Sequence, residues 1–173
     1  DYILREMTHA SGGFFSAQDA DSEGVEGKFF VWSEEEICAA LGDAEVTRAA
    51  LAYWGVDKGP NFEGHSILFV PREPSEAAEA LGITEEKLEQ LIAVARARLY
   101  DVRDKRVHPG LDDKVLASWN GLALAAFAEA GRVLDRPDYI AAAVKNAGFV
   151  TTQMMAGDRL LRSWKDGPAK IKG

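Results

Sequence analysis

Three short segments carry most of the side chains that could do acid–base chemistry or hold a polar ligand. The first lies between residues 19 and 27 and contains four carboxylates, those of Asp19, Asp21, Glu23 and Glu26. Clustered carboxylates can bind a cation, accept hydrogen bonds from sugar hydroxyls or transfer protons. A solvated acidic turn explains the same composition, and the twelve-residue pattern of a calcium-binding loop is absent.

The second segment, residues 59–65, brings Asn61, Glu63 and His65 close together among glycine and proline. An amide, a carboxylate and an imidazole can bind a ligand or form an acid–base set, because histidine titrates nearest to neutral pH. The alternative is a turn in which asparagine and glycine supply unusual backbone angles.

The third segment, residues 108–121, is the most informative of the three. Its candidate side chains are Asp112, Asp113, Lys114, Trp119 and Asn120. The two aspartates precede a helix expected over 115–134, whose positive N-terminal end stabilises anions and lowers carboxylate pKa values. Carboxylates accept hydrogen bonds from sugar hydroxyls and an indole face packs on sugar C–H groups, so this set favours a carbohydrate site. The alternative is that Asp113 caps the helix and Trp119 belongs to the core.

The elements that must position these segments are mainly helical. Aromatic and β-branched runs at 14–18 and 28–32 predict a β-hairpin whose long tip is the acidic segment. A capping box at Ser33–Glu36 begins a helix, and further helices are expected over 44–54, 75–81 and 84–103. Short strands are expected over 67–70 and 158–165.

Two helices in the C-terminal half predict the architecture. The helix over 115–134 is apolar nearly all round, which is typical of a helix buried on every side. The next, over 139–155, carries Lys145, Asn146 and Gln153 on one side and is expected to face outward. A buried inner helix paired with an amphipathic outer one is the repeating unit of an α/α toroid, and an irregular bundle is the alternative.

Composition limits the function classes. The 173 residues suit about one domain, and the net charge of −8 argues against nucleic acid as a partner. No apolar run approaches the roughly 20 residues that span a membrane. The single cysteine, Cys38, is expected to be a buried structural thiol, which fits a cytoplasmic location. The chain starts without methionine in a helix-like stretch, so we expect it to be part of a longer protein.

Residues 12–32, 59–64 and 112–122 together resemble the YyaL family of large bacterial proteins, which is related to the spermatogenesis-associated thioredoxin-domain proteins of animals. The resemblance implies a thioredoxin-like domain followed by an (α/α)6 toroid similar to six-hairpin glycosidases and N-acylglucosamine epimerases. This chain lacks the thioredoxin-like part and any Cys-x-x-Cys pair, so residues 1–173 correspond to a single fragment of the toroid domain.

The expected function is therefore carbohydrate chemistry or carbohydrate binding in an acidic cleft, without metal or cofactor. The catalytic candidates are Asp19, Asp21, Asp112 and Asp113, and a general acid is expected to be Asp21 or Glu26. The substrate-binding candidates are Glu26, Asn61, Glu63, Lys114, Trp119 and Asn120. A non-catalytic sugar-binding or protein-interaction module is the alternative. Besides the sugar, the expected partners are a second copy or the remainder of a longer chain.

Overall fold

Helices dominate the computed structural model, which describes residues 1–165, 167 and 169–172. The mainly α class expected from the sequence is confirmed. The chain forms two compact units: residues 20–109, called here the central unit, and residues 1–19 with 110–173, called the terminal unit. The expectation that all residues belong to a single domain stays a prediction.

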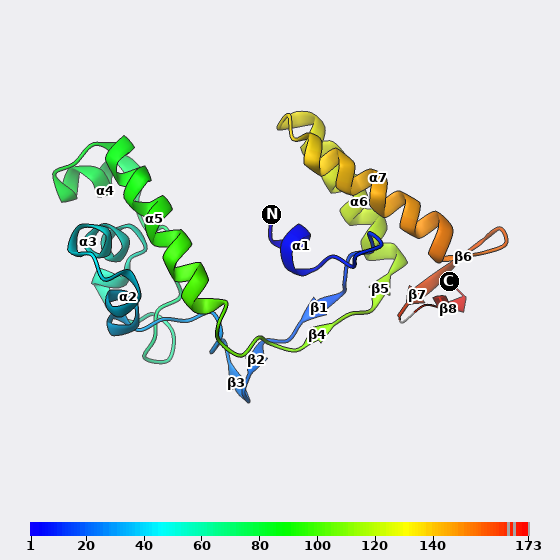
Figure 1. Ribbon diagram of the computed structural model, residues 1–173, viewed down its shortest axis with the longest axis horizontal. Helices are drawn as coiled ribbons and strands as arrows, with labels where there is room; N and C mark the ends of the chain where they lie inside the picture. Colours follow the sequence, from blue (N-terminus) through cyan, green and yellow to red (C-terminus); the bar gives the residue numbers. More distant parts are fainter. Residues whose placement is uncertain (166, 168, 173) are drawn as a thin grey trace. The chain divides into compact units, whose positions relative to one another are not determined.

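The central unit is built around one long helix. Its elements are β2 (Asp21–Ser22), β3 (Val25–Glu26), α2 (Glu34–Leu41), α3 (Ala44–Tyr53), the 3-10 helix η1 (Val56–Lys58), α4 (Pro74–Leu81) and α5 (Glu85–Arg103). Helices α2, α3 and α4 pack against α5 (Figure 1). The buried residues of α5 are Leu88, Leu91, Ile92, Ala95 and Leu99, the apolar positions that its helical spacing predicts.

Side-chain caps define where three of these helices begin. Ser33 and Glu36 form the predicted capping box of α2, because each side chain bonds the backbone amide of the other residue. The Asp43 carboxylate accepts hydrogen bonds from the amides of Glu45 and Val46 and so caps α3. The Thr84 hydroxyl accepts one from Lys87 and caps α5.

The predicted hairpin between residues 14–18 and 28–32 is wrong. The hairpin is shorter and lies inside the expected tip, where Asp21 pairs with Glu26 and Ser22 with Val25. Its two turn residues, Glu23 and Gly24, both have positive φ angles, 54° and 75°, as a two-residue turn of this twist requires. Local turn geometry therefore decided the pairing, and residues 27–30 form a turn of their own.

Two further expectations for the central unit are corrected. Residues 67–70 form no strand, because backbone pairing stops at Ser66, which bridges Trp32. Cys38 is exposed instead of buried. Ile37 and Leu41 of α2 face the core. Successive residues of a helix are rotated by about 100°, so Cys38, which follows Ile37, points away from the core.

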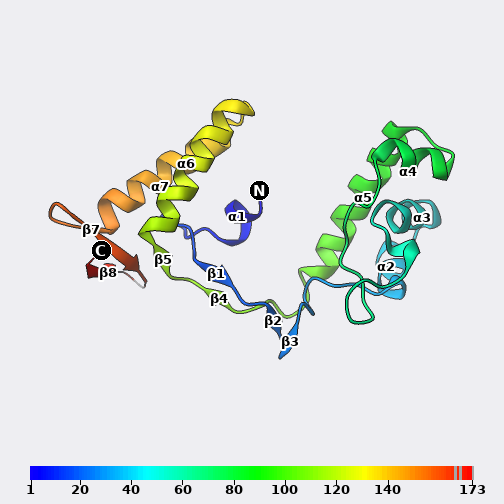
Figure 2. The ribbon, with the colours of Figure 1, turned by 180° about the vertical axis from the view of Figure 1, so that it is seen from behind.

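The terminal unit combines a helical pair with short strands. Its elements are α1 (Tyr2–Glu6), β1 (Ala17–Gln18), β4 (Leu111–Asp112), β5 (Val115–Leu116), α6 (Ala117–Val133), α7 (Pro137–Gln153), β6 (Met155–Ala156), β7 (Arg159–Trp164) and β8 (Ala169–Lys172). Helices α6 and α7 lie side by side in both ribbon views (Figures 1 and 2). Strand β7, where a strand was expected, pairs antiparallel with β5, β6 and β8.

Helices α6 and α7 bury different faces from those that the sequence predicts, which were every side of α6 and the side of α7 away from Asn146. Helix α6 is buried along only one side, and Leu122 on another side is 73% exposed. Asn146 of α7, expected on the outward face, is fully buried. Its side chain donates a hydrogen bond to the carbonyl of Gly12, so a polar residue fills the core where the N-terminal segment crosses α7.

Candidate functional site

Two of the predicted catalytic carboxylates are neighbours in the terminal unit. Strand β1 pairs with β4 so that Ala17 lies opposite Asp112, and the amide of Asp19 donates to the carbonyl of Gly110 at 2.7 Å. Asp19 and Asp112 are therefore diagonal neighbours on one face of this ribbon. They line a shallow hollow of about 370 Å³ together with Ala17, Gln18, Gly110 and Leu111.

The Asp112 carboxylate is held in its ionised form by a neighbouring lysine. The Lys114 ammonium lies 3.1 Å from it and lowers the pKa of the Asp112 carboxyl. The sequence predicts a lowered pKa for this carboxyl, but it attributes the change to the N-terminal end of the helix. The cause is instead the ion pair with Lys114, because α6 begins only at Ala117. A lowered pKa suits a base or hydrogen-bond acceptor.

Asp113 does not cap the helix. The N-cap position of α6 is Leu116, and no side chain bonds the first helical amides. The Asp113 carboxylate instead lies 2.6 Å from the Lys165 ammonium. The predicted cap fails because strand β5 separates Asp113 from the start of the helix.

Trp119 and Asn120 occupy different surroundings although they are adjacent in the sequence. Trp119 is 52% exposed on α6, whereas Asn120 is 1% exposed. The Asn120 amide bonds both the N–H and the C=O of Phe14 and the carbonyl of Leu116. We therefore assign Asn120 to the fold and not to ligand contact.

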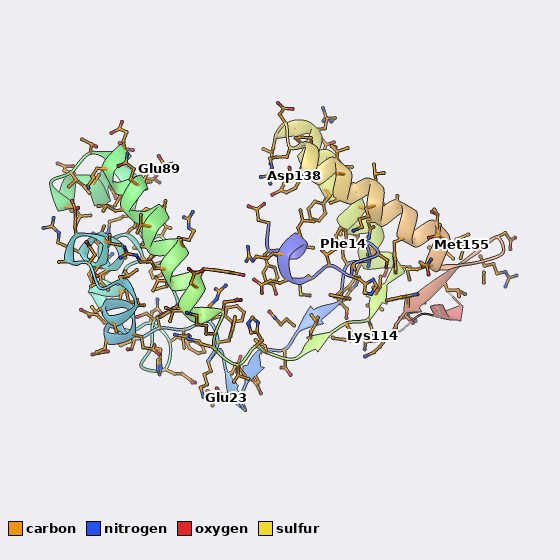
Figure 3. All side chains as sticks on the ribbon, in the orientation of Figure 1. Phe14, Glu23, Glu89, Lys114, Asp138 and Met155 are labelled. Atoms are coloured by element: carbon orange, nitrogen blue, oxygen red, sulfur yellow. The ribbon has the colours of Figure 1, made fainter. Side chains whose placement is uncertain are left out.

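A cleft of about 610 Å³ in the central unit lies between the acidic hairpin and the second predicted segment. Predicted binding residues Glu26 and Glu63 both line it, and so does His65. Figure 3 shows Glu23, another lining residue, at the tip of the β2–β3 hairpin. Residues of both the first and the second predicted segment therefore line one cleft.

Ion pairs divide the charged groups of this cleft into two classes. The Glu23 carboxylate lies 2.8 Å from the Lys28 ammonium, and Glu36 lies 3.5 Å from the Arg106 guanidinium. Within the part of the chain that the structure describes, the carboxylates of Glu26 and Glu63 form no hydrogen bond or ion pair. These two carboxylates are the lining acids free to accept hydrogen bonds from a ligand.

Arg106 fixes the wall of the cleft, and sequence reasoning missed it. Its guanidinium donates to the carbonyls of Phe29 and Val31 at 3.1 and 2.7 Å and lies 4.1 Å from the Trp32 ring centroid. Burial lowers the pKa of the Arg106 guanidinium, and Glu36 opposes that change. No motif surrounds this arginine, so only the tertiary contacts identify it.

The remaining candidates, Asn61 and Asp21, lie in local backbone structures of the central unit. The Asn61 side chain accepts from the amide of Ile67 at 2.8 Å and donates to its carbonyl at 3.0 Å, which closes the turn that carries Glu63. Asp21 sits opposite Glu26 in the β2–β3 hairpin and is exposed.

None of the helices in residues 1–165 is long and apolar enough to span a membrane. The same part of the chain contains no group of three or more His, Cys, Asp or Glu side chains placed to hold a metal ion.

No protein-family model matches the chain. The chain is similar to spermatogenesis-associated protein 20. It is 30% identical to the Homo sapiens protein in an alignment 193 positions long, gaps included, that covers 96% of this chain and 25% of the human protein. The Mus musculus protein is 29% identical in an alignment of 188 positions that covers 94% of this chain and 24% of the mouse protein. An uncharacterized protein of Caenorhabditis elegans is 29% identical in an alignment of 182 positions that covers 92% of this chain and 25% of the nematode protein.

This chain therefore spans about a quarter of the length of the relatives it matches. The similarity supports the resemblance to the spermatogenesis-associated proteins along almost the whole chain. These relatives are animal proteins, and they give no support to the expected bacterial source.

Proposed function

We propose that the chain binds a sugar in the cleft of the central unit, as one part of a larger carbohydrate-active protein. The observation that carries the proposal is the pair of unengaged carboxylates, Glu26 and Glu63, on the lining of one 610 Å³ cleft. A cleft of this size accommodates a small ligand such as one or two sugar rings.

The lining suits sugar hydroxyls better than a purely apolar ligand. Carboxylate oxygens are acceptors only, and each can take more than one hydroxyl hydrogen. The half-buried ring of Phe62 also lines the cleft and can pack on sugar C–H groups. Arg106 also lines the cleft and holds the backbone carbonyls of Phe29 and Val31, so part of the lining is ordered before a ligand binds.

The proposal includes the toroid architecture that the family resemblance implies. The adjacent helices α6 and α7 are consistent with one helical hairpin of such a toroid. Glu26 and Glu63 are the proposed acid–base residues if the sugar is chemically transformed, because glycoside hydrolysis and epimerisation both require groups that transfer protons. Asp19 and Asp112 in the hollow of the terminal unit are the competing location.

The test is titration calorimetry of the 173-residue chain against a panel of neutral mono- and disaccharides. For a sugar that binds, we expect Glu26→Gln and Glu63→Gln each to weaken binding about tenfold, because charge-assisted hydrogen bonds are lost. Glu79→Gln, at an exposed carboxylate on α4 outside the cleft, is the matched control and should leave binding unchanged. Every sugar bound by the wild type is then incubated with the protein and assayed for turnover.

Two outcomes would overturn the proposal. Binding that survives both cleft variants but disappears in Asp112→Asn would place the sugar in the hollow of the terminal unit. Absence of any heat across the panel, with a folded protein by circular dichroism, would reject sugar binding by this chain.

A further inference from the structure

A second cavity of the central unit, with a volume of about 260 Å³, lies at the N-terminal end of α2. Its walls come from residues 32–35 and from five residues of the stretch 56–66. It shares no lining residue with the 610 Å³ cleft in which we place the sugar. A ligand in this second cavity would therefore contact a different set of side chains.

Ser66 supplies this cavity with a buried polar group that the fold does not use. The residue is 4% exposed. Its amide donates to the carbonyl of Trp32 at 2.7 Å, and its carbonyl accepts from the amide of Trp32 at 3.0 Å. The hydroxyl forms no hydrogen bond to any residue that the structure describes, and it is the polar group of Ser66 left to face the cavity. Because burial of a hydroxyl without a partner is unfavourable, this group indicates a polar ligand.

The charge of the cavity indicates the sign of that ligand. Glu34 and Glu35 line it, and the lining residues that the structure describes include no lysine, arginine or histidine. Neither carboxylate forms an ion pair with a described residue, whereas the neighbouring Glu36 is paired with Arg106 at 3.5 Å. The uncompensated charge attracts a cation.

The walls indicate the size and kind of cation. Trp32 and Val56 are each 3% exposed and, with Pro60, give the cavity an apolar surface. A hard metal ion is held by oxygen ligands within about 2.6 Å, and apolar walls supply none. A volume of about 260 Å³ with a few polar groups suits a small organic molecule whose methylene groups pack on these walls.

We propose that the cavity binds a short primary alkylammonium that carries a hydroxyl at its other end. The ammonium has donors only, and the carboxylates of Glu34 and Glu35 have acceptors only, so they form charge-assisted hydrogen bonds. The methylene groups of the ligand pack against Val56 and Pro60. Its hydroxyl bonds the hydroxyl of Ser66, which can both donate and accept.

The test is titration calorimetry of the 173-residue chain with ethanolamine, 3-aminopropanol and 4-aminobutanol. The series is used because the affinity should be highest for the chain length that spans the carboxylates and Ser66. For that length, we expect the amino alcohol to bind at least about tenfold more tightly than the diol, which lacks the charge. Added salt should weaken binding of the amino alcohol and leave the diol unaffected.

Two variants test the two ends of the ligand separately. Glu34→Gln should weaken binding of the amino alcohol about tenfold. Glu85→Gln, at the corresponding first residue of α5, is the matched control and should leave binding unchanged. Ser66→Ala should weaken the amino alcohol about fivefold but not the alkylamine of the same length, which has no hydroxyl. Its melting temperature should equal that of the wild type, because the Ser66 hydroxyl has no partner among the described residues.

Three outcomes would overturn the proposal. The first is the absence of heat from every amino alcohol while circular dichroism shows a folded protein. The second is binding that survives Glu34→Gln but is lost in Glu63→Gln, because the amine would then lie in the larger cleft. The third is an equal effect of Ser66→Ala on the amino alcohol and the alkylamine, because the ligand hydroxyl would then not contact Ser66.

Discussion

Asn146 donates a hydrogen bond from its side-chain Nδ2 to the Oδ1 of Asn120 at 2.8 Å, in a core where neither residue is more than 1% exposed. The same Oδ1 accepts from the amide of Phe14 at 2.8 Å. One buried polar group therefore ties α6, α7 and the N-terminal segment together. Buried amides of this kind stabilise a fold only while their partners stay in place, because an unsatisfied group keeps its full desolvation cost.

Replacing Asn120 tests this network. Asn120→Ala leaves the N–H and C=O of Phe14 without their partner and removes one of the two hydrogen bonds of the Asn146 amide, so we expect the free energy of unfolding to fall by about 2–4 kcal/mol. Urea denaturation followed by circular dichroism measures it. Gln90→Ala, at an exposed amide on α5, is the control and should change stability by less than about 0.5 kcal/mol. Equal effects of the two substitutions would contradict a structural role for Asn120.

Two glycines of α6 should respond in opposite directions to alanine. A Cβ at Gly131 would lie 2.7 Å from Ile140 Cδ1 and 3.0 Å from the Ile140 backbone nitrogen, so α7 would have to shift. We expect Gly131→Ala to destabilise by about 1–3 kcal/mol. A Cβ at Gly121 meets no described atom within 4 Å, and Gly121→Ala should stabilise by about 0.5–1 kcal/mol through helix propensity.

Thermal unfolding of the two variants side by side measures this contrast, because both glycines lie in the same helix and differ only in their surroundings. Stabilisation by Gly131→Ala would show that α6 and α7 do not approach each other as closely as described.

The cap of α3 predicts a pH dependence of stability. The Val46 amide donates to the Asp43 carboxylate and holds the pKa of that carboxyl below its ordinary value of 3.8. The folded state thus favours the ionised form, so the contribution is complete above pH 3.8 and is lost as the pH falls through the lowered pKa.

Asp43→Asn retains a capping oxygen but cannot titrate, so its melting temperature should approach that of the wild type as the pH decreases from 6 to about 2.5. Thermal scans at fixed ionic strength measure the gap. Glu79→Gln, which removes an exposed carboxylate whose side chain caps no helix, is the control for loss of one charge. A gap between wild type and Asp43→Asn that stays constant with pH would contradict the role of the charge.

The sequence by itself determined those features whose causes are local. The capping box at Ser33 and Glu36 and the buried spacing from Leu88 to Leu99 follow from residues within a few positions of one another, and the structure contains both. The sequence also identified Glu26 and Glu63 as candidates, although it treated them as parts of separate segments.

The predicted hairpin between 14–18 and 28–32 failed for a physical reason. The β-propensity of the two flanking runs carries no information on register, whereas Glu23 and Gly24 determine a tight turn between them. The nearer pairing closes the smaller loop and costs less chain entropy.

Only the tertiary structure decided which side chains contact one another and which carboxylates form no hydrogen bond or ion pair within the described residues. It places Glu26 and Glu63 on one cleft, engages Arg106 with the carbonyls of residues 29 and 31, and pairs Asp113 with Lys165. It also removes Asn120 from the surface, because an asparagine on an apolar helix is buried where a neighbouring backbone offers partners for its amide. Such contacts depend on distances between remote segments, and residue type and spacing along the chain do not contain those distances.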